Sequence, residues 1–232
     1  MNHARLIVLS GDAGAGKDSV ANILVDSHGW RAYSLAAPLK RFASDMFGFT
    51  DMQLYGPSSA RNAPDPRWAR PCPRCCSSGL RLADRGPIIP SNRVECEDCE
   101  GKGKLNDNSP RRILQLMGEE FLRQMIHVDA LTMRAAPDLA KLLEQGHSVV
   151  VNDARNDNDR NNLFYWLNAA RVDVRTYKKR NANAKKDAWR LHASEQRKAK
   201  DDEVEYILYN NEEWPFPSLG DRVATMLKEL YG

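Results

Sequence analysis

The stretch that most constrains this chain covers residues 6–19. Four apolar residues are followed by Ser10 and then GDAGAGKDS, in which Gly11 and Gly16-Lys17 have the spacing of a phosphate-binding loop. Small residues let successive backbone N–H groups face a polyphosphate, and the helical spacing of the apolar residues that follow places the loop at a helix N-terminus. The stretch therefore predicts a strand, a phosphate-binding loop and a helix, in that order.

Within this loop, the residues expected to bind a nucleotide are Gly11, Ala13, Gly14, Ala15, Gly16, Lys17, Asp18 and Ser19. Lys17 would reach the β- and γ-phosphates. The general pattern has Ser or Thr directly after the lysine, whereas here Asp18 takes that position and Ser19 comes one later, which leaves the metal contact open. The alternative is a glycine-rich turn without a ligand. The order of strand, loop, lysine and helix favours phosphate binding.

Composition limits the class of protein. The chain has 232 residues, enough for one α/β domain with an insertion or a domain plus a small module. Its net charge of +3 is too small to argue by itself for a nucleic-acid partner. No apolar stretch reaches the length of a membrane span and no signal-peptide pattern is present, so a cytoplasmic location without membrane contact is expected.

Strand-like and helix-like segments alternate along most of the chain. This alternation predicts a parallel sheet covered by helices on both faces. The remaining expected strands cover residues 30–34, 147–151, 172–176 and 204–208, and the remaining expected helices lie near residues 38–46, 109–121, 139–146, 161–170 and 219–230.

Residues 57–108 differ from the rest, because Pro, Gly, Arg and Ser dominate there and no helical period is visible. Two C-x₂-C pairs, Cys72/Cys75 and Cys96/Cys99, have the spacing of a tetrahedral zinc site whose ion would stabilise a module with almost no core. Cys76 could replace Cys75 as a ligand. The arginines of this module suit nucleic acid, but acidic residues beside the second pair favour a structural or oligomer-forming role, for example in a homodimer.

Several charged residues outside the loop are candidate ligands. Asp153 and Arg155 follow the β-branched run at residues 149–151, where a carboxylate could hold magnesium and an arginine could bind an anion. The alternative role of Asp153 is to form a turn. Other cationic residues are candidates too, and their alternative is to be solvated surface charges. The remaining cations are Lys40, Arg112 and Arg123, together with a basic segment through residues 178–200 that could be a solvated face, a nucleic-acid tail or a mobile lid.

Taken together, these motifs resemble the deoxynucleoside monophosphate kinases of tailed bacteriophages. The resemblance covers nearly everything outside residues 57–108. It is carried by GAGKDS at 14–19, AAPLK at 36–40, SPRRILQ at 109–115 with Met117-Gly118, DAR at 153–155, HASE at 192–195 and NN at 210–211. This chain departs from the family at Glu119, where a threonine is usual, and at residues 212–215, which replace Gly-Thr. The second cysteine pair, CEDCEGKG, looks like the zinc-binding repeat of DnaJ-type chaperones.

The resemblance implies a nucleoside monophosphate kinase fold of the three-layer α/β/α type with a five-stranded parallel sheet, formed by residues 1–56 and 109–232. Residues 180–202 would form the lid and residues 57–108 the zinc-binding insertion. The implied reaction transfers the γ-phosphoryl group of ATP to a dNMP with Mg²⁺, in the host cytoplasm if the chain is phage-encoded. Lys17, Asp18, Asp153 and Arg155 are the implied catalytic residues, with Ser19 also serving the metal; Lys40, Arg112, Arg123, Arg155, Arg180 and Arg190 would bind the acceptor.

Two other functions fit parts of the pattern. One is another small-molecule P-loop kinase, such as a kinase of dephospho-coenzyme A. The other is a nucleotide-gated module that binds nucleic acid through the zinc ribbon and the basic segment. The order of the motifs from GAGKDS at 14–19 to NN at 210–211 favours the deoxynucleoside monophosphate kinase.

Overall fold

The structure is a computed structural model that describes residues 4–12, 14–82, 93–175, 203–210 and 217–232. The chain forms two compact units. The first comprises Met1–Leu39 and Leu116–Gly232, and the second comprises Lys40–Gln115. None of the described helices is long and apolar enough to cross a membrane.

The first unit is built on a parallel sheet. Among the described residues it has five strands in the order β2-β7-β1-β8-β9. They are β1 (Leu6–Ser10), β2 (Arg31–Tyr33), β7 (Val149–Val151), β8 (Ala170–Arg175) and β9 (Tyr206–Tyr209). In the centre, Ile7 of β1 aligns with Val150 of β7 and Ala170 of β8. The predicted α/β fold with a five-stranded parallel sheet is confirmed.

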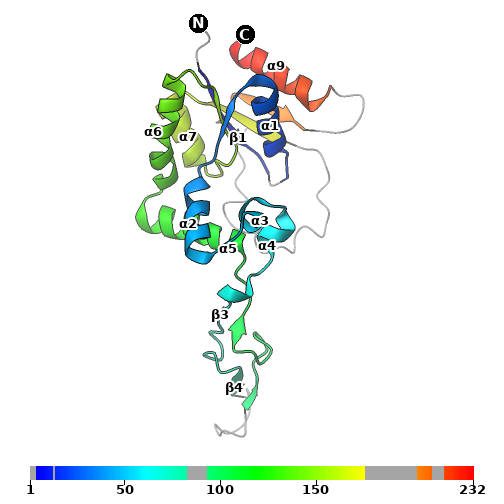
Figure 1. Cartoon of the computed structure of the whole chain (residues 1–232), viewed down its shortest axis with the longest axis vertical. Helices are drawn as coiled ribbons and strands as arrows, with labels where there is room; N and C mark the ends of the chain where they lie inside the picture. Colours follow the sequence, from blue (N-terminus) through cyan, green and yellow to red (C-terminus); the bar gives the residue numbers. More distant parts are fainter. Residues whose placement is uncertain (1–3, 13, 83–92, 176–202, 211–216) are drawn as a thin grey trace. The chain divides into compact units, whose positions relative to one another are not determined.

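Helices cover both faces of this sheet (Figure 1). Because side chains alternate along a strand, Ile7 and Leu9 of β1 pack on one face with α1 (Lys17–His28) and α9 (Leu219–Tyr231). Leu6 and Val8 pack on the other face with α6 (Ala130–Glu144) and α7 (Asp157–Leu167). All four of these β1 residues are at most 2% exposed, so the strand that leads into the phosphate-binding loop is fixed from both sides.

One helix differs from the sequence-based prediction. The α-helix that was expected to continue through Phe121 ends as α5 (Pro110–Gln115), and a π-helix, η3 (Leu116–Ile126), follows directly. Helical spacing puts Phe121 on the apolar face of the expected helix with Ile113 and Met117, but Phe121 is 51% exposed, whereas Glu119 and Arg123 are buried. The π-helical segment thus has two charged side chains on its buried side. π-Helical turns are rare and are often found at functional sites.

The second unit begins with short helices. After α2 (Ala37–Phe47) come α3 (Asp51–Tyr55), α4 (Ser58–Asn62) and the 3₁₀ helix η1 (Pro66–Trp68). No helix was expected within residues 57–108, so α4 and η1 correct that prediction. Helical spacing puts Phe42, Ala43 and Met46 on the apolar face of the helix expected near residues 38–46. In the structure Phe42 and Met46 are 47% and 58% exposed, while Ala43 is buried. α4 and η1, with five and three residues, are too short for a hydrophobic period to be recognised in the sequence.

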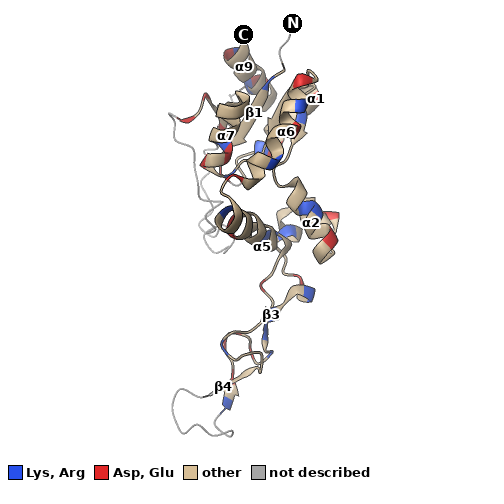
Figure 2. Cartoon of the chain, turned by 90° about the vertical axis from the view of Figure 1, so that its left-hand side faces the viewer, with Lys and Arg blue, Asp and Glu red and all other residues tan. Residues whose placement is uncertain are grey.

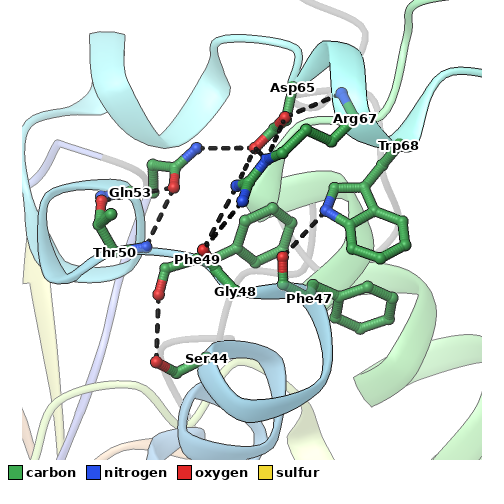
Figure 3. Close-up of polar contacts among 9 residues, drawn as sticks. All are labelled: Ser44, Phe47, Gly48, Phe49, Thr50, Gln53, Asp65, Arg67 and Trp68. Atoms are coloured by element: carbon green, nitrogen blue, oxygen red, sulfur yellow. Dashed lines mark hydrogen bonds and ion pairs between the residues drawn. The ribbon is translucent and has the colours of Figure 1, made fainter.

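A polar cluster around Asp65, which we call the Asp65 cluster, connects these helices (Figure 3). The guanidinium of Arg67 donates to the Asp65 carboxylate, with a shortest distance of 2.6 Å, and to the Gly48 carbonyl at 3.3 Å. Gln53 of α3 donates to Asp65 at 3.0 Å. Trp68 donates through Nε1 to the Phe47 carbonyl at 3.0 Å. These bonds hold the ends of α2 and α3 against the segment that leads into the cysteine-rich part.

The cysteine-rich part of the second unit consists of two antiparallel strand pairs. β3 (Arg70–Pro71) pairs with β6 (Lys104–Leu105), and β4 (Leu80–Leu82) pairs with β5 (Arg93–Glu95). We call residues 70–105 the cysteine module. The compact unit that contains it, Lys40–Gln115, is wider than the insertion expected at residues 57–108.

Candidate phosphate-binding site and cysteine cluster

The glycine-rich loop that was predicted to bind phosphate lies between β1 and α1, the elements expected on either side of it. Three of its glycines have positive φ, at 131° for Gly11, 83° for Gly14 and 95° for Gly16. These angles are rare for residues with a side chain. At Gly11 the backbone is also confined, because a Cβ atom would lie 2.2 Å from the Val174 carbonyl oxygen of β8. The glycines are therefore required by the conformation of the loop and by its contact with the neighbouring strand.

Lys17 curls back over this loop. Its Nζ donates to the carbonyl oxygens of Gly11 and Asp12, at 2.8 and 2.9 Å. The ammonium group is thus held against the backbone of the loop rather than extended into solvent. Contact of Lys17 with the phosphates of a nucleotide stays a prediction.

An asparagine at the end of β9 contacts the same loop. Asn210 Nδ2 donates to the Ala15 carbonyl at 3.0 Å, between residues 195 positions apart. A Cβ atom on Gly16 would lie only 2.0 Å from Asn210 Nδ2. Sequence reasoning noted the pair at 210–211 as part of the family resemblance but did not predict this contact, since it depends on β9 and the loop meeting in the fold.

Asp18 lies in the first turn of α1 and is exposed, as is Ser19. The carboxylate of Asp18 accepts a hydrogen bond of 2.7 Å from Nδ2 of Asn152, which directly follows β7. The carboxylate of Asp18 and the hydroxyl of Ser19 are oxygen ligands, which magnesium prefers. Asn152 was not singled out from the sequence, and the structure makes it a partner of Asp18.

Asp153 has a different environment. Its carboxylate accepts hydrogen bonds from Ser34 Oγ at 2.5 Å, from the Leu35 N–H at 2.8 Å and from the Ala36 N–H at 3.1 Å. These three bonds fix the turn between β2 and α2. The structure thus supports the alternative that was considered for this residue, a turn-forming role, and magnesium binding by Asp153 stays a prediction.

A buried acid lies on β8 beside the loop. Asp173 accepts hydrogen bonds from Ser10 Oγ at 2.8 Å and from Arg175 Nε at 2.7 Å. Ser10 is the last residue of β1, immediately before Gly11. The bond therefore fixes the point at which the chain leaves the sheet and enters the loop.

Arg123 lies in a buried ion pair. Its Nη2 is 2.7 Å from Asp159 Oδ2, its Nε is 3.6 Å from Glu119 Oε2, and its side chain is 6% exposed. Burial raises the pKa of Asp159, while the charge of Arg123 opposes this effect. The pair fastens η3 to α7. This buried partner gives Arg123 a structural role, and its predicted contact with the acceptor phosphate stays a prediction.

The remaining acceptor candidates are divided between the two units. Arg155 is partly buried in the first unit. Lys40 and Arg112 belong to the second unit, where Lys40 lies 4.4 Å above the Tyr55 ring and Arg112 lies 3.6 Å from Asp107. Ala13, Arg180 and Arg190, and the expected lid at residues 180–202, lie outside the described residues.

Four cysteines of the second unit converge. The Sγ atoms of Cys72, Cys75, Cys96 and Cys99 all lie within 4.8 Å of one another, and all four residues are buried. The Cys72–Cys96 and Cys75–Cys99 sulfur distances are 3.8 and 3.7 Å. Four sulfurs bound to zinc at about 2.3 Å in a tetrahedron are about 3.8 Å apart. The cluster therefore has the size and ligand type to hold one zinc ion.

The two halves of the cysteine cluster have matching backbones. The Cys72 N–H donates to the Gly103 carbonyl and the Cys96 N–H donates to the Gly79 carbonyl, both at 2.9 Å. Cys76 and Glu100 occupy equivalent positions with φ of 48° and 49°. Cys76 is exposed, and its Sγ lies 3.9 Å from the Pro73 carbonyl oxygen. Of the two alternatives left open by the sequence, the structure places Cys75 and not Cys76 in the cluster.

The thiols of this cluster are shielded from water. Burial raises the pKa of Cys99 to about 11 in the metal-free chain. The Gly103 N–H donates to Cys99 Sγ at 3.2 Å, a bond that would stabilise a thiolate. A metal ion would have to displace the thiol protons on binding.

Comparisons with known proteins include a partly matching relative and a distant structure. No protein-family model matches the chain. The chain is 39% identical over 69 residues to a protein of Acanthamoeba polyphaga mimivirus named "Putative deoxynucleotide monophosphate kinase". The matched stretch covers 30% of this chain and 36% of that protein, so the chain spans about a third of the length of the curated relative. The crystal structure of TT1252 from Thermus thermophilus aligns over the whole of both chains with a TM-score of 0.43 and 16% identity.

Proposed function

We propose that this protein is a deoxynucleoside monophosphate kinase that transfers the γ-phosphoryl group of ATP to a dNMP. The observation that carries the proposal is the glycine loop between β1 and α1, over which the Lys17 ammonium group is held by two backbone carbonyls. The name of the mimivirus relative supports a nucleotide kinase, and the ordered motifs on both sides of the cysteine module support a monophosphate as acceptor. A bacteriophage origin stays a prediction.

In the proposed reaction, an oxygen of the dNMP phosphate forms a bond to the γ-phosphorus. The bond from that phosphorus to the bridging oxygen breaks, and ADP leaves with the electron pair. Such a transfer depends on alignment and charge stabilisation more than on covalent chemistry. Lys17 and the N–H groups of the loop would stabilise the charge that develops on the donor phosphates.

Magnesium, when bound with the nucleotide, would neutralise charge on the β- and γ-phosphate oxygens. Asp18 and Ser19 are the residues we propose to serve it, because both are exposed oxygen donors in the first turn of α1. The bond from Asn152 holds one oxygen of the Asp18 carboxylate. Acceptor binding by Arg155, Lys40 and Arg112, and closure by the lid arginines, belong to the same proposal.

We propose a structural zinc ion for the four-cysteine cluster. Charge pairing in and beside the cysteine module disfavours nucleic acid as its partner. Figure 2 shows basic residues on the β3 and β4 part of the ribbon. Three of its arginines have a carboxylate within 2.8 Å, in the pairs Arg70–Asp107, Arg74–Asp98 and Arg81–Glu97. A surface whose cations are already matched by acids attracts phosphate backbones weakly.

The test is an ADP-release assay of the purified chain with ATP, across the dNMPs and dephospho-coenzyme A. We expect turnover with at least one dNMP and none with dephospho-coenzyme A. Lys17→Ala should lower turnover by about 100-fold or more, by analogy with the loss of one group that stabilises transition-state charge. Lys141→Ala, the same substitution on the exposed surface of α6, is the matched control and should be active.

Two results would overturn the proposal. One is turnover with dephospho-coenzyme A alone. The other is an unchanged rate in Lys17→Ala. Salt-sensitive binding of DNA or RNA without phosphorylation of free nucleotides would instead support the nucleic-acid module.

A further inference from the structure

We propose that Asn210 is a positioning residue that sets the direction of one N–H group in the phosphate-binding loop. The inference rests on the proposed function only in taking this loop as the site of the donor phosphates. It assigns Asn210 a role toward the polyphosphate that is independent of the base of the nucleotide.

Asn210 is anchored to the sheet through its backbone and bonded to the loop through its side chain. Its backbone N–H donates to the Arg175 carbonyl at 2.7 Å, which continues the pairing of β9 with β8 beyond Tyr209. Its Nδ2 donates to the Ala15 carbonyl at 3.0 Å. Asn210 therefore connects the carboxyl end of the sheet to the turn that opens α1.

The bond to Ala15 has a consequence for the next residue. The Ala15 carbonyl and the Gly16 N–H belong to one planar trans peptide, in which the two groups point in opposite directions. By holding the carbonyl toward β9, Asn210 turns the Gly16 N–H away from β9. Fixed N–H groups of this kind are what allow a glycine-rich loop to bind phosphate oxygens without reorganising.

Gly16 and Asn210 also fit each other sterically. A Cβ atom at residue 16 would lie 2.0 Å from Asn210 Nδ2 and 3.1 Å from its Cγ. The asparagine side chain thus occupies the space that any other residue at position 16 would need. The positive φ of Gly16, 95°, independently favours glycine at this position.

The experiment measures binding of ATP, GTP and inorganic tripolyphosphate to the full chain. Asn210→Leu keeps the branched shape and the number of side-chain heavy atoms, and it removes the hydrogen bond without adding charge. We expect it to weaken all three ligands equally, by about 5- to 10-fold, the usual value of one hydrogen bond. Asn210→Asp replaces the donor by an anion and should weaken all three by about 10- to 100-fold.

Two controls separate positioning from folding. Asn168→Asp makes the same charge change at the exposed left-handed end of α7, which precedes β8, and should leave all three affinities unchanged. The KM for the dNMP and the midpoint of thermal unfolding should also be nearly the same in both Asn210 variants as in the wild-type chain. A residue that only stabilised the fold would lower the midpoint of thermal unfolding and change the KM for ATP and the KM for the dNMP together.

Three outcomes would overturn the inference. Loss of ATP binding with retained GTP and tripolyphosphate binding would show that Asn210 contacts the base. Unchanged affinities in both Asn210 variants would show that the bond to Ala15 has no role in binding. A parallel loss of stability and of dNMP binding would assign Asn210 to the fold. If Lys17→Ala fails to bind nucleotide while Asn210→Leu behaves like the wild type, the proposed function stands and this inference fails.

Discussion

The phosphate-binding loop and the cysteine cluster use glycine in the same way but are held by different forces. In both, a Cβ atom on a glycine of positive φ would meet a carbonyl oxygen at about the same distance, 2.2 Å for Gly11 and 2.1 Å for Gly79. The loop directly follows β1, whose five residues are all at most 2% exposed. In the described part of the cysteine module, the cluster of buried hydrophobic residues consists of the four cysteines themselves, with the partly buried Leu105 packed against them.

This difference indicates what each turn needs to keep its shape. Apolar burial stabilises the sheet at about 25 cal/mol per Å², so the loop should keep its conformation without a ligand. The cysteine module buries too little apolar surface for this, and a bound ion would have to supply its folding free energy.

The largest effect is expected at Cys96. Cys96→Ser should abolish metal binding, which contributes about 10–16 kcal/mol in comparable zinc sites, and should unfold the cysteine module while the first unit stays folded. Metal analysis should fall from about one zinc per chain to none. Amide hydrogen exchange should become fast in residues 70–82 and 93–105 only. Cys76→Ser is the matched control, because Cys76 lies outside the cluster, and its metal content should be unchanged.

Retention of zinc and of exchange protection in Cys96→Ser would contradict this contrast. It would mean that the cysteine module is held by its strand pairs and turns. Loss of protection in the sheet of the first unit would contradict the expected independence of the two regions.

A second, smaller effect is expected within the phosphate-binding loop. Gly11→Ala adds a Cβ atom 2.2 Å from the Val174 carbonyl, so the loop or β8 must shift, at a cost of about 3 kcal/mol. Gly14→Ala meets no atom within 4 Å and should cost only the strain of its positive φ, about 1–2 kcal/mol. Chemical denaturation of the two variants measures the difference. Equal losses would show that conformation alone, and not contact with the sheet, fixes the loop.

The contrast also shows what could be predicted from sequence. The loop, the strands and the cysteine pairs depend on local spacing, so they were recognised from residues close together in the chain. The π-helix was missed because the burial of Glu119 and Arg123 depends on Asp159, which lies on another helix. The bond from Asn210 to Ala15 was missed for the same reason, since its two ends meet only through the sheet order.

A third effect is expected from the Asp65 cluster, which stabilises the second unit without metal. Asp65→Asn weakens the paired hydrogen bonds from Arg67, and the expected loss is about 1–2 kcal/mol, since the Arg67 side chain is 54% exposed and keeps part of its hydration. Asp45→Asn, on the exposed side of α2, is the matched control and should change stability little.

The same residue gives a pH dependence. The hydrogen bond from Arg67 holds the pKa of the Asp65 carboxyl well below its ordinary value of 3.8. A depressed pKa contributes stability that is present above the ordinary pKa and is lost as the pH falls through the folded value. The free-energy difference between wild type and Asp65→Asn should therefore be full above about pH 5 and shrink below pH 4. A difference that stays constant from pH 6 to pH 3 would show that the carboxylate charge plays no part.

The smallest effect is expected at the surface of the cysteine module. Arg74 lies 2.8 Å from Asp98 and 3.7 Å from Glu97, but its side chain is 43% exposed. Exposed ion pairs gain little, because water and salt already screen both charges. Arg74→Ala should leave zinc content unchanged and the midpoint of thermal unfolding nearly unchanged, both at low salt and at high salt. If Arg74→Ala instead lowered the midpoint as much as Cys96→Ser does, the ion pairs rather than the cysteine cluster would hold the module.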